Sequence, residues 1–280
     1  MRVLVMLDGT VTDAETPLIR VDDLGITRGD GVFETILVVG GKPRELGPHL
    51  DRLARSAAML QLPVPDRAAW ERCVQLVLDN WQGGDEMALK LVYTRGPEFG
   101  DGSPTGYAMG LPIGEKVRAA RESGVTAVLL DRGYDPEIVA RAPWLLLGAK
   151  SLSYAVNMAA YRHAESVGAD EVIFVATDGS VLEGPTSNVV TATGNTLRTT
   201  PPSSGILRGT TQGALFRAAE RAGWVTKVEP MTVRELKDAE AVFLASSVRK
   251  ITRVHTLDGV VLPDSSALHK ELNALYESEY

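Results

Sequence analysis

The chain has 280 residues, of which 44% are hydrophobic and 23% are charged, a balance typical of folded globular proteins. This composition excludes a disordered or collagen-like chain, and the length suits two domains of roughly 100–150 residues each. With 29 Lys and Arg against 36 Asp and Glu, the net charge is −7, which disfavours nucleic acid as a partner. We expect no membrane partner either, because no apolar run approaches the ~18 residues that span a bilayer.

The N-terminal sequence MRVLVMLDGT lacks the hydrophobic core of a signal peptide, which predicts a cytoplasmic protein. Cys73 is the single cysteine, and one thiol can form neither an internal disulfide nor a thiolate metal site. It lies in a helix-like segment and is expected to be a small buried side chain. The four histidines are widely separated, and none matches a two-histidine metal motif, so no metal is expected.

Dipeptides typical of hairpin turns recur between apolar or alternating segments. They are Asp8-Gly9, Gly40-Gly41, Asp178-Gly179, Gly194-Asn195 and Asp258-Gly259. Apolar residues at helical spacing predict helices over 48–61, 67–82, 154–167, 209–222 and 265–278. Strands and helices alternate irregularly, which favours an α+β fold with largely antiparallel sheets over a doubly wound parallel sheet.

A segment dense in glycine and proline, from Tyr93 to Glu115, divides the chain into unequal parts. We expect an N-terminal α/β domain over 1–115, a linker over 116–122 and a C-terminal domain over 123–280. A domain boundary here would follow the strand-like sequence TGYAMG.

The common enzyme motifs are absent. Neither GDGVFE nor GDGSPTG continues as a nucleotide-binding loop, and no GxSxG pentapeptide occurs. Lys150 follows an apolar stretch and opens a predicted helix, where poor solvation favours the neutral amine that a Schiff-base lysine requires. Taken alone, Lys150 is better interpreted as a solvated loop lysine, because single lysines are usually surface residues.

Five sequence fragments in a fixed order resemble the class IV, fold-type IV aminotransferases, which use pyridoxal 5′-phosphate. They are RGDGVFET from Arg28, HLDRL from His49, the pair K-S-x-x-x-x-x-N and E-G-x-x-S-N at Lys150 and Glu183, GILRGTT from Gly205, and FLASSVRKITRV from Phe243. The resemblance covers almost the whole chain. It implies a smaller N-terminal α/β sandwich and a larger C-terminal domain with a barrel-like sheet. It further implies a homodimer whose active site lies between the two domains.

The resemblance also implies a role for each matched residue. Lys150 would carry the cofactor as a Schiff base and act as the proton-transfer base. Glu183 would face the pyridine nitrogen and keep it protonated. Cationic and hydroxyl side chains would bind the phosphate: Arg52, Thr210, Thr211, Ser246 and Ser247.

Other assignments leave alternatives open. Tyr154 could reach the phenolic oxygen of the cofactor, although branched-chain enzymes place that tyrosine one position later. Arg52 could instead pair with Asp51 or Glu71, and Thr210 could simply cap a helix. Asn188 is expected to support the turn that carries Glu183.

Three enzymes of this family are candidates for the reaction that the chain catalyses. D-amino-acid aminotransferases hold the substrate carboxylate with Arg-x-His, but the matching run Gly96 to Tyr107 contains no Arg, Lys or His. Branched-chain aminotransferases have a GTA turn where this chain has Ser246-Ser247-Val248. The length and the DDLGITRGDGVFET segment most resemble 4-amino-4-deoxychorismate lyase.

We therefore expect a lyase that eliminates pyruvate from aminodeoxychorismate to give 4-aminobenzoate for folate biosynthesis. A class IV aminotransferase acting on D-amino or branched-chain amino acids with a 2-oxo acid acceptor is the alternative. Arg28 stands where the family has an aromatic residue, and we expect it, together with Phe33, to bind the small-molecule substrate. The other interpretation of Arg28 is a surface pair with Asp22, Asp23 or Asp30.

Overall fold

The computed structural model describes residues 2–280 and contains two compact units. The first unit consists of residues up to Gly114 together with Ala149–Tyr154, and the second of Glu115–Gly148 with Ala155–Tyr280. Within residues 2–280, no helix is both long and apolar enough to cross a membrane.

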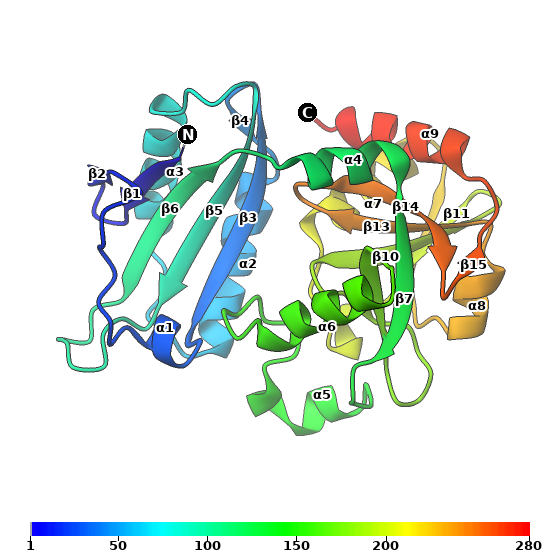
Figure 1. The fold of residues 1–280 in the computed structure, drawn as a ribbon, viewed down its shortest axis with the longest axis horizontal. Helices are drawn as coiled ribbons and strands as arrows, with labels where there is room; N and C mark the ends of the chain where they lie inside the picture. Colours follow the sequence, from blue (N-terminus) through cyan, green and yellow to red (C-terminus); the bar gives the residue numbers. More distant parts are fainter. Residues whose placement is uncertain (1) are drawn as a thin grey trace. The chain divides into compact units, whose positions relative to one another are not determined.

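The first unit is built on a six-stranded sheet with the order β2-β1-β6-β5-β3-β4, in which every pairing is antiparallel (Figure 1). Its strands are β1 (Val3–Met6), β2 (Val11–Thr12), β3 (Gly31–Val39), β4 (Lys42–Pro43), β5 (Glu86–Thr94) and β6 (Thr105–Leu111). Its helices are α1 (Leu24–Thr27), α2 (Leu46–Met59) and α3 (Arg67–Asp79).

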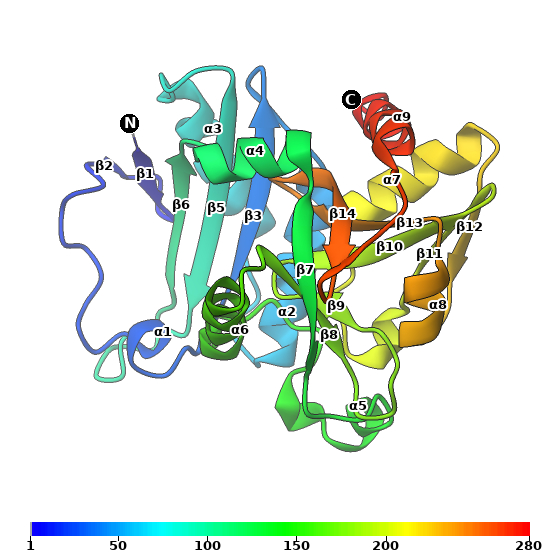
Figure 2. The ribbon, with the colours of Figure 1, turned by 45° about the vertical axis from the view of Figure 1, so that its right-hand side comes forward.

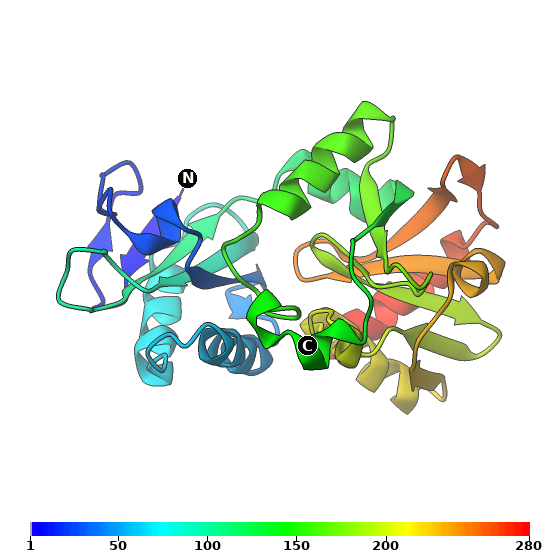
Figure 3. The same cartoon turned by 90° about the horizontal axis from the view of Figure 1, so that it is seen from below.

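Helices α2 and α3 cover one face of this sheet, on the same side of the strands in Figure 3. Strand alternation points Val32, Ile36 and Val38 of β3 toward these helices, where all three are buried. Phe33, Thr35 and Leu37 lie on the opposite face, where Phe33 and Thr35 are half-buried and Leu37 is fully buried. The two faces therefore differ: one forms the apolar core, and the other keeps partly exposed side chains.

The second unit contains a nine-stranded sheet of mixed direction with the order β12-β11-β10-β13-β14-β7-β8, to which β15 adds beside β14 and β9 beside β10. Its strands are β7 (Val125–Asp131), β8 (Glu171–Val175), β9 (Glu183–Gly184), β10 (Ser187–Thr193), β11 (Thr196–Thr199), β12 (Val225–Val228), β13 (Ala241–Ser246), β14 (Lys250–Leu257) and β15 (Val260–Val261). A bridge between Val175 and Val181 connects β8 back toward β9, so the sheet curls into a barrel-like form.

The helices of the second unit are α4 (Glu115–Ser123), α5 (Ile138–Arg141), α6 (Ala155–Ser166), α7 (Thr210–Arg221), α8 (Val233–Asp238) and α9 (Ser266–Glu277), with two 3₁₀ turns at Pro143–Leu145 and Pro202–Ser204. Helices α7 and α9 pack side by side against the sheet (Figure 2). Leu215, Phe243 and Tyr276 from these elements are almost fully buried together. Apolar periodicity thus places one face of each helix in a common core.

The predicted local structure is confirmed. Each of the five turn dipeptides joins an antiparallel pair or bridge, and the five predicted helices correspond to α2, α3, α6, α7 and α9. Cys73 is completely buried, as expected. The α+β class is confirmed too, although the second sheet has three parallel pairs, β11 with β12, β14 with β7 and β7 with β8.

The expected domain boundaries need correction. The predicted linker 116–122 lies inside helix α4, which packs on β14 and belongs to the second unit. Residues 149–154 belong to the first unit, because their backbone pairs with β3: Phe33 N–H donates to the Lys150 carbonyl at 3.0 Å, and Leu152 N–H donates to the Gly31 carbonyl at 2.8 Å. Local composition cannot reveal such a return of the chain.

Candidate active site

Lys150 lies in an extended segment of the first unit, not at the helix start that its sequence predicts, because α6 begins only at Ala155. Its backbone N–H donates to Ser56 Oγ at 3.0 Å, and its carbonyl accepts from Phe33 N–H. The Lys150 Nζ stands 4.5 Å from the centroid of the Phe33 ring. The Tyr154 ring packs edge-on against the Phe33 ring, with the two ring centroids 5.3 Å apart. The backbone is therefore held independently of the lysine side chain.

A buried ionic cluster on α2 and β3 surrounds Arg52. Arg52 Nε and Nη2 donate to the two carboxylate oxygens of Glu34 at 2.7 and 2.6 Å. His49 Nδ1 is 2.7 Å from Glu34 Oε2. Arg52 thus pairs with Glu34, whereas Asp51, one of the surface partners that the sequence offered, pairs with Arg67. The contact of Arg52 with the cofactor phosphate stays a prediction.

Burial and charge act in opposite directions on this cluster. Burial alone raises the pKa of Glu34, but the charge and hydrogen bonds of Arg52, with His49 adding to them, bring this pKa well below its usual value. Burial lowers the pKa of His49, and the attraction of Glu34 does not reverse that. Glu34 is therefore ionised and His49 neutral at neutral pH.

The neutral, buried His49 predicts a pH-dependent stability. Below the ordinary histidine pKa of 6.5, the unfolded chain binds a proton at His49 that the folded chain does not, so the free energy of unfolding falls as the pH drops. In the cofactor-free protein this contribution reaches at most about 1.4 kcal/mol per pH unit. Urea unfolding between pH 7.5 and 5.5 should therefore show a smaller slope for His49→Gln. His163→Gln, an exposed control, should keep the wild-type slope, and parallel curves for all three proteins would contradict the prediction.

Glu183 lies on the short strand β9 of the second unit. Its carboxylate oxygens accept from Leu207 N–H at 3.1 and 3.2 Å. Asn188 pairs with Glu183 across β9 and β10, and its Nδ2 donates to the Leu207 carbonyl at 2.8 Å. Asn188 therefore supports the turn that carries Glu183, as predicted.

Thr210 and Thr211 form the first turn of α7, and both are buried. The N-cap is Gly209, with no side-chain cap and no acidic residue in the first turn. A Cβ at Gly209 would come within 2.0 Å of Asn188 Oδ1, so only glycine allows this close approach. No acidic side chain in the first turn of α7 therefore offsets the positive end of the helix dipole. Such a helix start is suited to binding an anion.

Ser246 is the last residue of β13, and Ser247 lies in the tight turn that leads into β14. Arg249 follows in the same turn, and its Nη2 donates to Thr186 Oγ1 at 2.8 Å. It also forms an ion pair with the buried Glu171. Arg249 thereby connects the turn that contains Ser246 to the segment that follows Glu183. Ser246 and Glu183, both predicted to contact the cofactor, are therefore positioned by the same arginine within the second unit.

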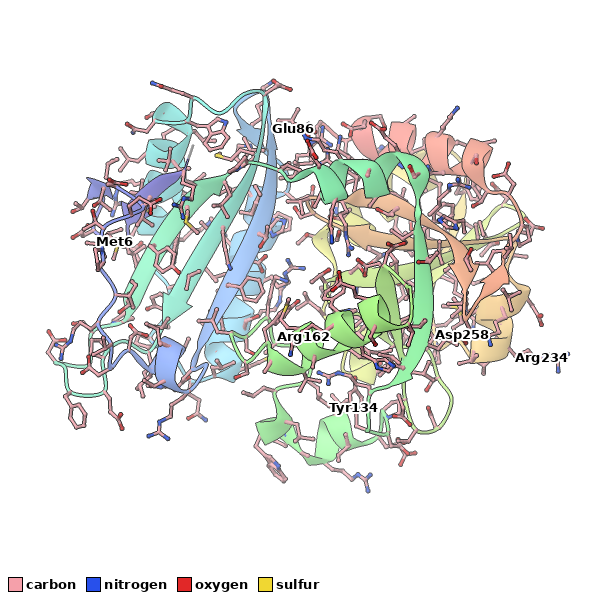
Figure 4. All side chains as sticks on the ribbon, in the orientation of Figure 1. Met6, Glu86, Tyr134, Arg162, Arg234 and Asp258 are labelled. Carbon is pink, nitrogen blue, oxygen red and sulfur yellow. The ribbon has the colours of Figure 1, made fainter. Side chains whose placement is uncertain are left out.

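Tyr134, labelled in Figure 4, lies in the segment between β7 and α5. Burial, with the negative charge of Glu183 adding to it, raises the pKa of Tyr134 to about 12. The phenol therefore stays protonated at neutral pH and donates to the Ser204 carbonyl at 3.3 Å. Sequence reasoning missed Tyr134, because no motif of the resemblance includes it.

Glu34 and Ser56 were missed as well. Arg52 and Ser56 are four residues apart and share one face of α2, a spacing that would have indicated a common environment. Glu34 follows the predicted substrate residue Phe33 directly, but an acidic residue inside a strand gives no local indication of its partner.

Arg28 has none of the three partners that the sequence offered. Its guanidinium is 3.5 Å from the Glu98 carboxylate, and both side chains are exposed, at 66% and 41%. Asp22 pairs with Arg20, and Asp30 pairs with Arg95. An exposed ion pair of this kind holds the Arg28 side chain only weakly. That Arg28 binds the substrate stays a prediction.

The donor set fits pyridoxal 5′-phosphate. The first unit carries the amine of Lys150 and the buried guanidinium of Arg52, groups of the kind that combine with an aldehyde and with a phosphate. The second unit carries the carboxylate of Glu183 and a helix start with two threonines, groups of the kind that suit a protonated ring nitrogen and phosphate oxygens. Which of these groups contact the cofactor stays a prediction. No cluster of metal-ligating side chains occurs among residues 2–280.

Comparison with known proteins agrees with this donor set. Residues 31–257 match the family model described as amino-transferase class IV. The chain therefore belongs to the class IV aminotransferase family and is a pyridoxal-phosphate-dependent enzyme that acts on small molecules.

A curated relative from Mycobacterium tuberculosis, named bifunctional aminodeoxychorismate lyase / D-amino acid transaminase, is 47% identical over 269 residues, covering 93% of each chain. A solved structure described as a hypothetical aminotransferase from M. tuberculosis in its PLP-bound form has a TM-score of 0.96 and 45% identity, covering 100% of this chain and 98% of that one. The fold IV-transaminase CpuTA1 from Curtobacterium pusillum has a TM-score of 0.93 and 44% identity, covering 99% of both chains. The similarity thus confirms the fold-type IV architecture.

Proposed function

We propose that this enzyme is an aminodeoxychorismate lyase that releases pyruvate and 4-aminobenzoate, and that D-amino-acid transamination is its second candidate activity. The observation that carries the proposal is the similarity to the M. tuberculosis relative, whose name combines both activities. The run from Gly96 to Tyr107 contains no Arg, Lys or His, which disfavours the D-amino-acid reaction. Because one similar protein is named for both reactions, we retain both candidates.

In this proposal each residue has the role that the family resemblance implies for it. Lys150 binds the aldehyde carbon, and Glu183 holds a proton at the ring nitrogen. The phosphate is held by cationic and hydroxyl groups: Arg52, Thr210, Thr211, Ser246 and Ser247. When bound, pyridoxal 5′-phosphate withdraws electrons from the carbon that carries the substrate amine. Tyr154 is assigned to the phenolic oxygen, and Phe33 to the substrate side of Lys150.

Lys150 has the central role in proton transfer. Its amine removes the proton from the amine-bearing carbon of aminodeoxychorismate. The C–O bond to the enolpyruvyl group then breaks and the ring becomes aromatic. The methylene carbon of the enolpyruvyl group takes up one proton, which balances the proton removed by Lys150, and pyruvate leaves. Atoms balance without a co-substrate, because aminodeoxychorismate contains all the atoms of 4-aminobenzoate and pyruvate. In transamination, Lys150 instead moves a proton between substrate and cofactor carbons, and a 2-oxo acid must then accept the amino group.

The need for an acceptor separates the two reactions. Cofactor-loaded enzyme supplied with aminodeoxychorismate and no 2-oxo acid should form 4-aminobenzoate and pyruvate in equal amounts. The same enzyme supplied with D-alanine and 2-oxoglutarate should form pyruvate and glutamate if the second candidate activity is present. Absence of 4-aminobenzoate, alongside turnover of D-alanine that depends on 2-oxoglutarate, would replace the lyase by the transaminase.

Arg28 is included in the proposal as a substrate-binding group. Aminodeoxychorismate carries two carboxylates, and a guanidinium matches a carboxylate in charge and geometry. In the lyase assay, Arg28→Ala should raise KM for aminodeoxychorismate, and unchanged KM and turnover would remove Arg28 from the site. The homodimer implied by the resemblance and the cytoplasmic location predicted from the N-terminal sequence stay predictions.

A further inference from the structure

The turn formed by residues 204–207 of the second unit supports Glu183 at one of its ends. Leu207 donates its N–H to both carboxylate oxygens of Glu183, at 3.1 and 3.2 Å. The Leu207 carbonyl accepts from Asn188 Nδ2 at 2.8 Å, so both backbone polar groups of Leu207 are held. Because a charged acceptor makes a stronger hydrogen bond than a neutral one, the position of Leu207 helps to fix the ionised carboxylate and its orientation.

Tyr134 holds the other end of the same turn. Its hydroxyl donates to the Ser204 carbonyl at 3.3 Å. The next residue, Gly205, has a φ of +84°, and a Cβ there would lie 3.1 Å from the Tyr134 hydroxyl oxygen. Glycine adopts this left-handed backbone without strain and has no Cβ to meet the phenol. The Tyr134 hydroxyl therefore lies directly against the backbone of the turn.

Tyr134 is itself fixed within the second unit. Its backbone carbonyl accepts from Thr177 N–H at 3.0 Å. Its side chain packs against the apolar cluster to which Leu182 and Ile206 belong. Leu182 directly precedes Glu183, and Ile206 lies inside the turn. With its pKa raised to about 12, the phenol keeps its proton at neutral pH and remains a donor. Tyr134 therefore has a fixed position from which to hold the turn.

We infer that Tyr134 is a positioning residue for Glu183: its hydroxyl holds the turn at Ser204, and the turn places the Leu207 N–H against the Glu183 carboxylate. The inference rests on the proposed function for the role of Glu183 toward the ring nitrogen of the cofactor. Without the hydroxyl, the Ser204 carbonyl loses this donor and the turn is free to shift, which weakens the bond between Leu207 and Glu183. Tyr134 is assigned no contact with substrate or cofactor.

The test is a double-mutant cycle that is read by cofactor affinity. The cofactor-free wild type, Tyr134→Phe, Glu183→Gln and the double variant are titrated with pyridoxal 5′-phosphate, and the four dissociation constants are measured. Tyr134→Phe should weaken binding by about 3- to 10-fold, the effect of one lost hydrogen bond. In the Glu183→Gln background the same substitution should change the affinity by less than about twofold, because the charged acceptor on which it acts is absent.

A second measurement separates positioning from substrate contact. In the lyase assay, Tyr134→Phe should lower kcat and leave KM for aminodeoxychorismate within about twofold of the wild type, because Tyr134 does not bind the substrate. An increase in KM with unchanged kcat would contradict the inference.

Tyr93→Phe is the matched control, because Tyr93 is a buried tyrosine of the first unit that packs on Trp70, and the substitution also removes one hydroxyl. This variant should bind pyridoxal 5′-phosphate as the wild type does. Tyr134→Leu, which lacks the hydroxyl too, takes the place of Tyr134→Phe in the cycle if Tyr134→Phe does not fold.

Three results of the cycle overturn the inference. Wild-type affinity in Tyr134→Phe would show that the hydroxyl is not needed. An equal loss in both backgrounds would show that the turn acts on the cofactor without Glu183. An affinity that Glu183→Gln leaves unchanged would remove the carboxylate through which Tyr134 acts. Failure of the proposed function is seen separately, as normal binding of pyridoxal 5′-phosphate with no 4-aminobenzoate in the lyase assay.

Discussion

Lys150→Ala is expected to lower turnover by at least about 100-fold and to remove the visible absorbance of the lysine-linked cofactor. The first effect follows because a positioned base contributes roughly 10²–10⁴-fold to proton transfer. The second follows because only an amine can hold the aldehyde covalently. Turnover is measured in the lyase and transaminase assays, and absorbance after loading with pyridoxal 5′-phosphate and gel filtration.

Loss of activity in Lys150→Ala would report on the lysine side chain, because the variant is expected to fold. The Lys150 segment is held through backbone bonds to Phe33 and Ser56, which alanine retains, so the first unit should fold normally. Equal urea midpoints for the cofactor-free wild type and variant would verify this. Lys42→Ala, on the exposed β4, should change neither readout. Retention of the visible absorbance in Lys150→Ala would show that another group holds the cofactor.

Glu34→Gln is expected to lower the free energy of unfolding by about 3–5 kcal/mol, because it leaves the buried Arg52 without its counter-charge. Glu34 is fully buried and holds both Arg52 and His49. Urea unfolding of the cofactor-free protein at pH 7.5 measures the change. If Arg52 also binds the phosphate, the variant should bind pyridoxal 5′-phosphate more weakly as well.

Asp51→Asn provides the matched control, since Asp51 lies beside Arg52 on α2 but pairs with Arg67 at the surface. An exposed pair contributes about 0–1 kcal/mol, so this variant should be near wild type. Should Glu34→Gln not fold, the double variant Glu34→Met with Arg52→Met removes both charges and should recover much of the stability. A Glu34→Gln protein as stable as Asp51→Asn would contradict the role given to the buried pair.

Features that depend on neighbouring residues were predicted well from the sequence. The turn dipeptides need only their own backbone preferences, and the helices need only a repeated apolar spacing, so both were confirmed. The family motifs around Lys150 and Glu183 also identified the family, because each motif is a short run. Helix α4 was missed because the glycine- and proline-rich run before it suggested a linker.

Contacts between distant residues could not be predicted in this way. Ser56 and Lys150 are 94 residues apart, and Arg52 and Glu34 are 18 residues apart on different elements. A lysine in an alternating strand is typical of a solvated face, and only the register of β3 with β5 brings Lys90 to Phe33.

The sequence by itself therefore determined the family and the cofactor, since these follow from short motifs in a fixed order, and the same motifs predict the residues on which the proposed chemistry depends. The tertiary structure alone decided that Lys150 is held by β3 and α2, that Glu34 fixes Arg52, and that Lys90 shares an aromatic ring with Lys150. The physical reason is that charge pairing and burial depend on which elements pack together, and packing is a property of the whole folded unit.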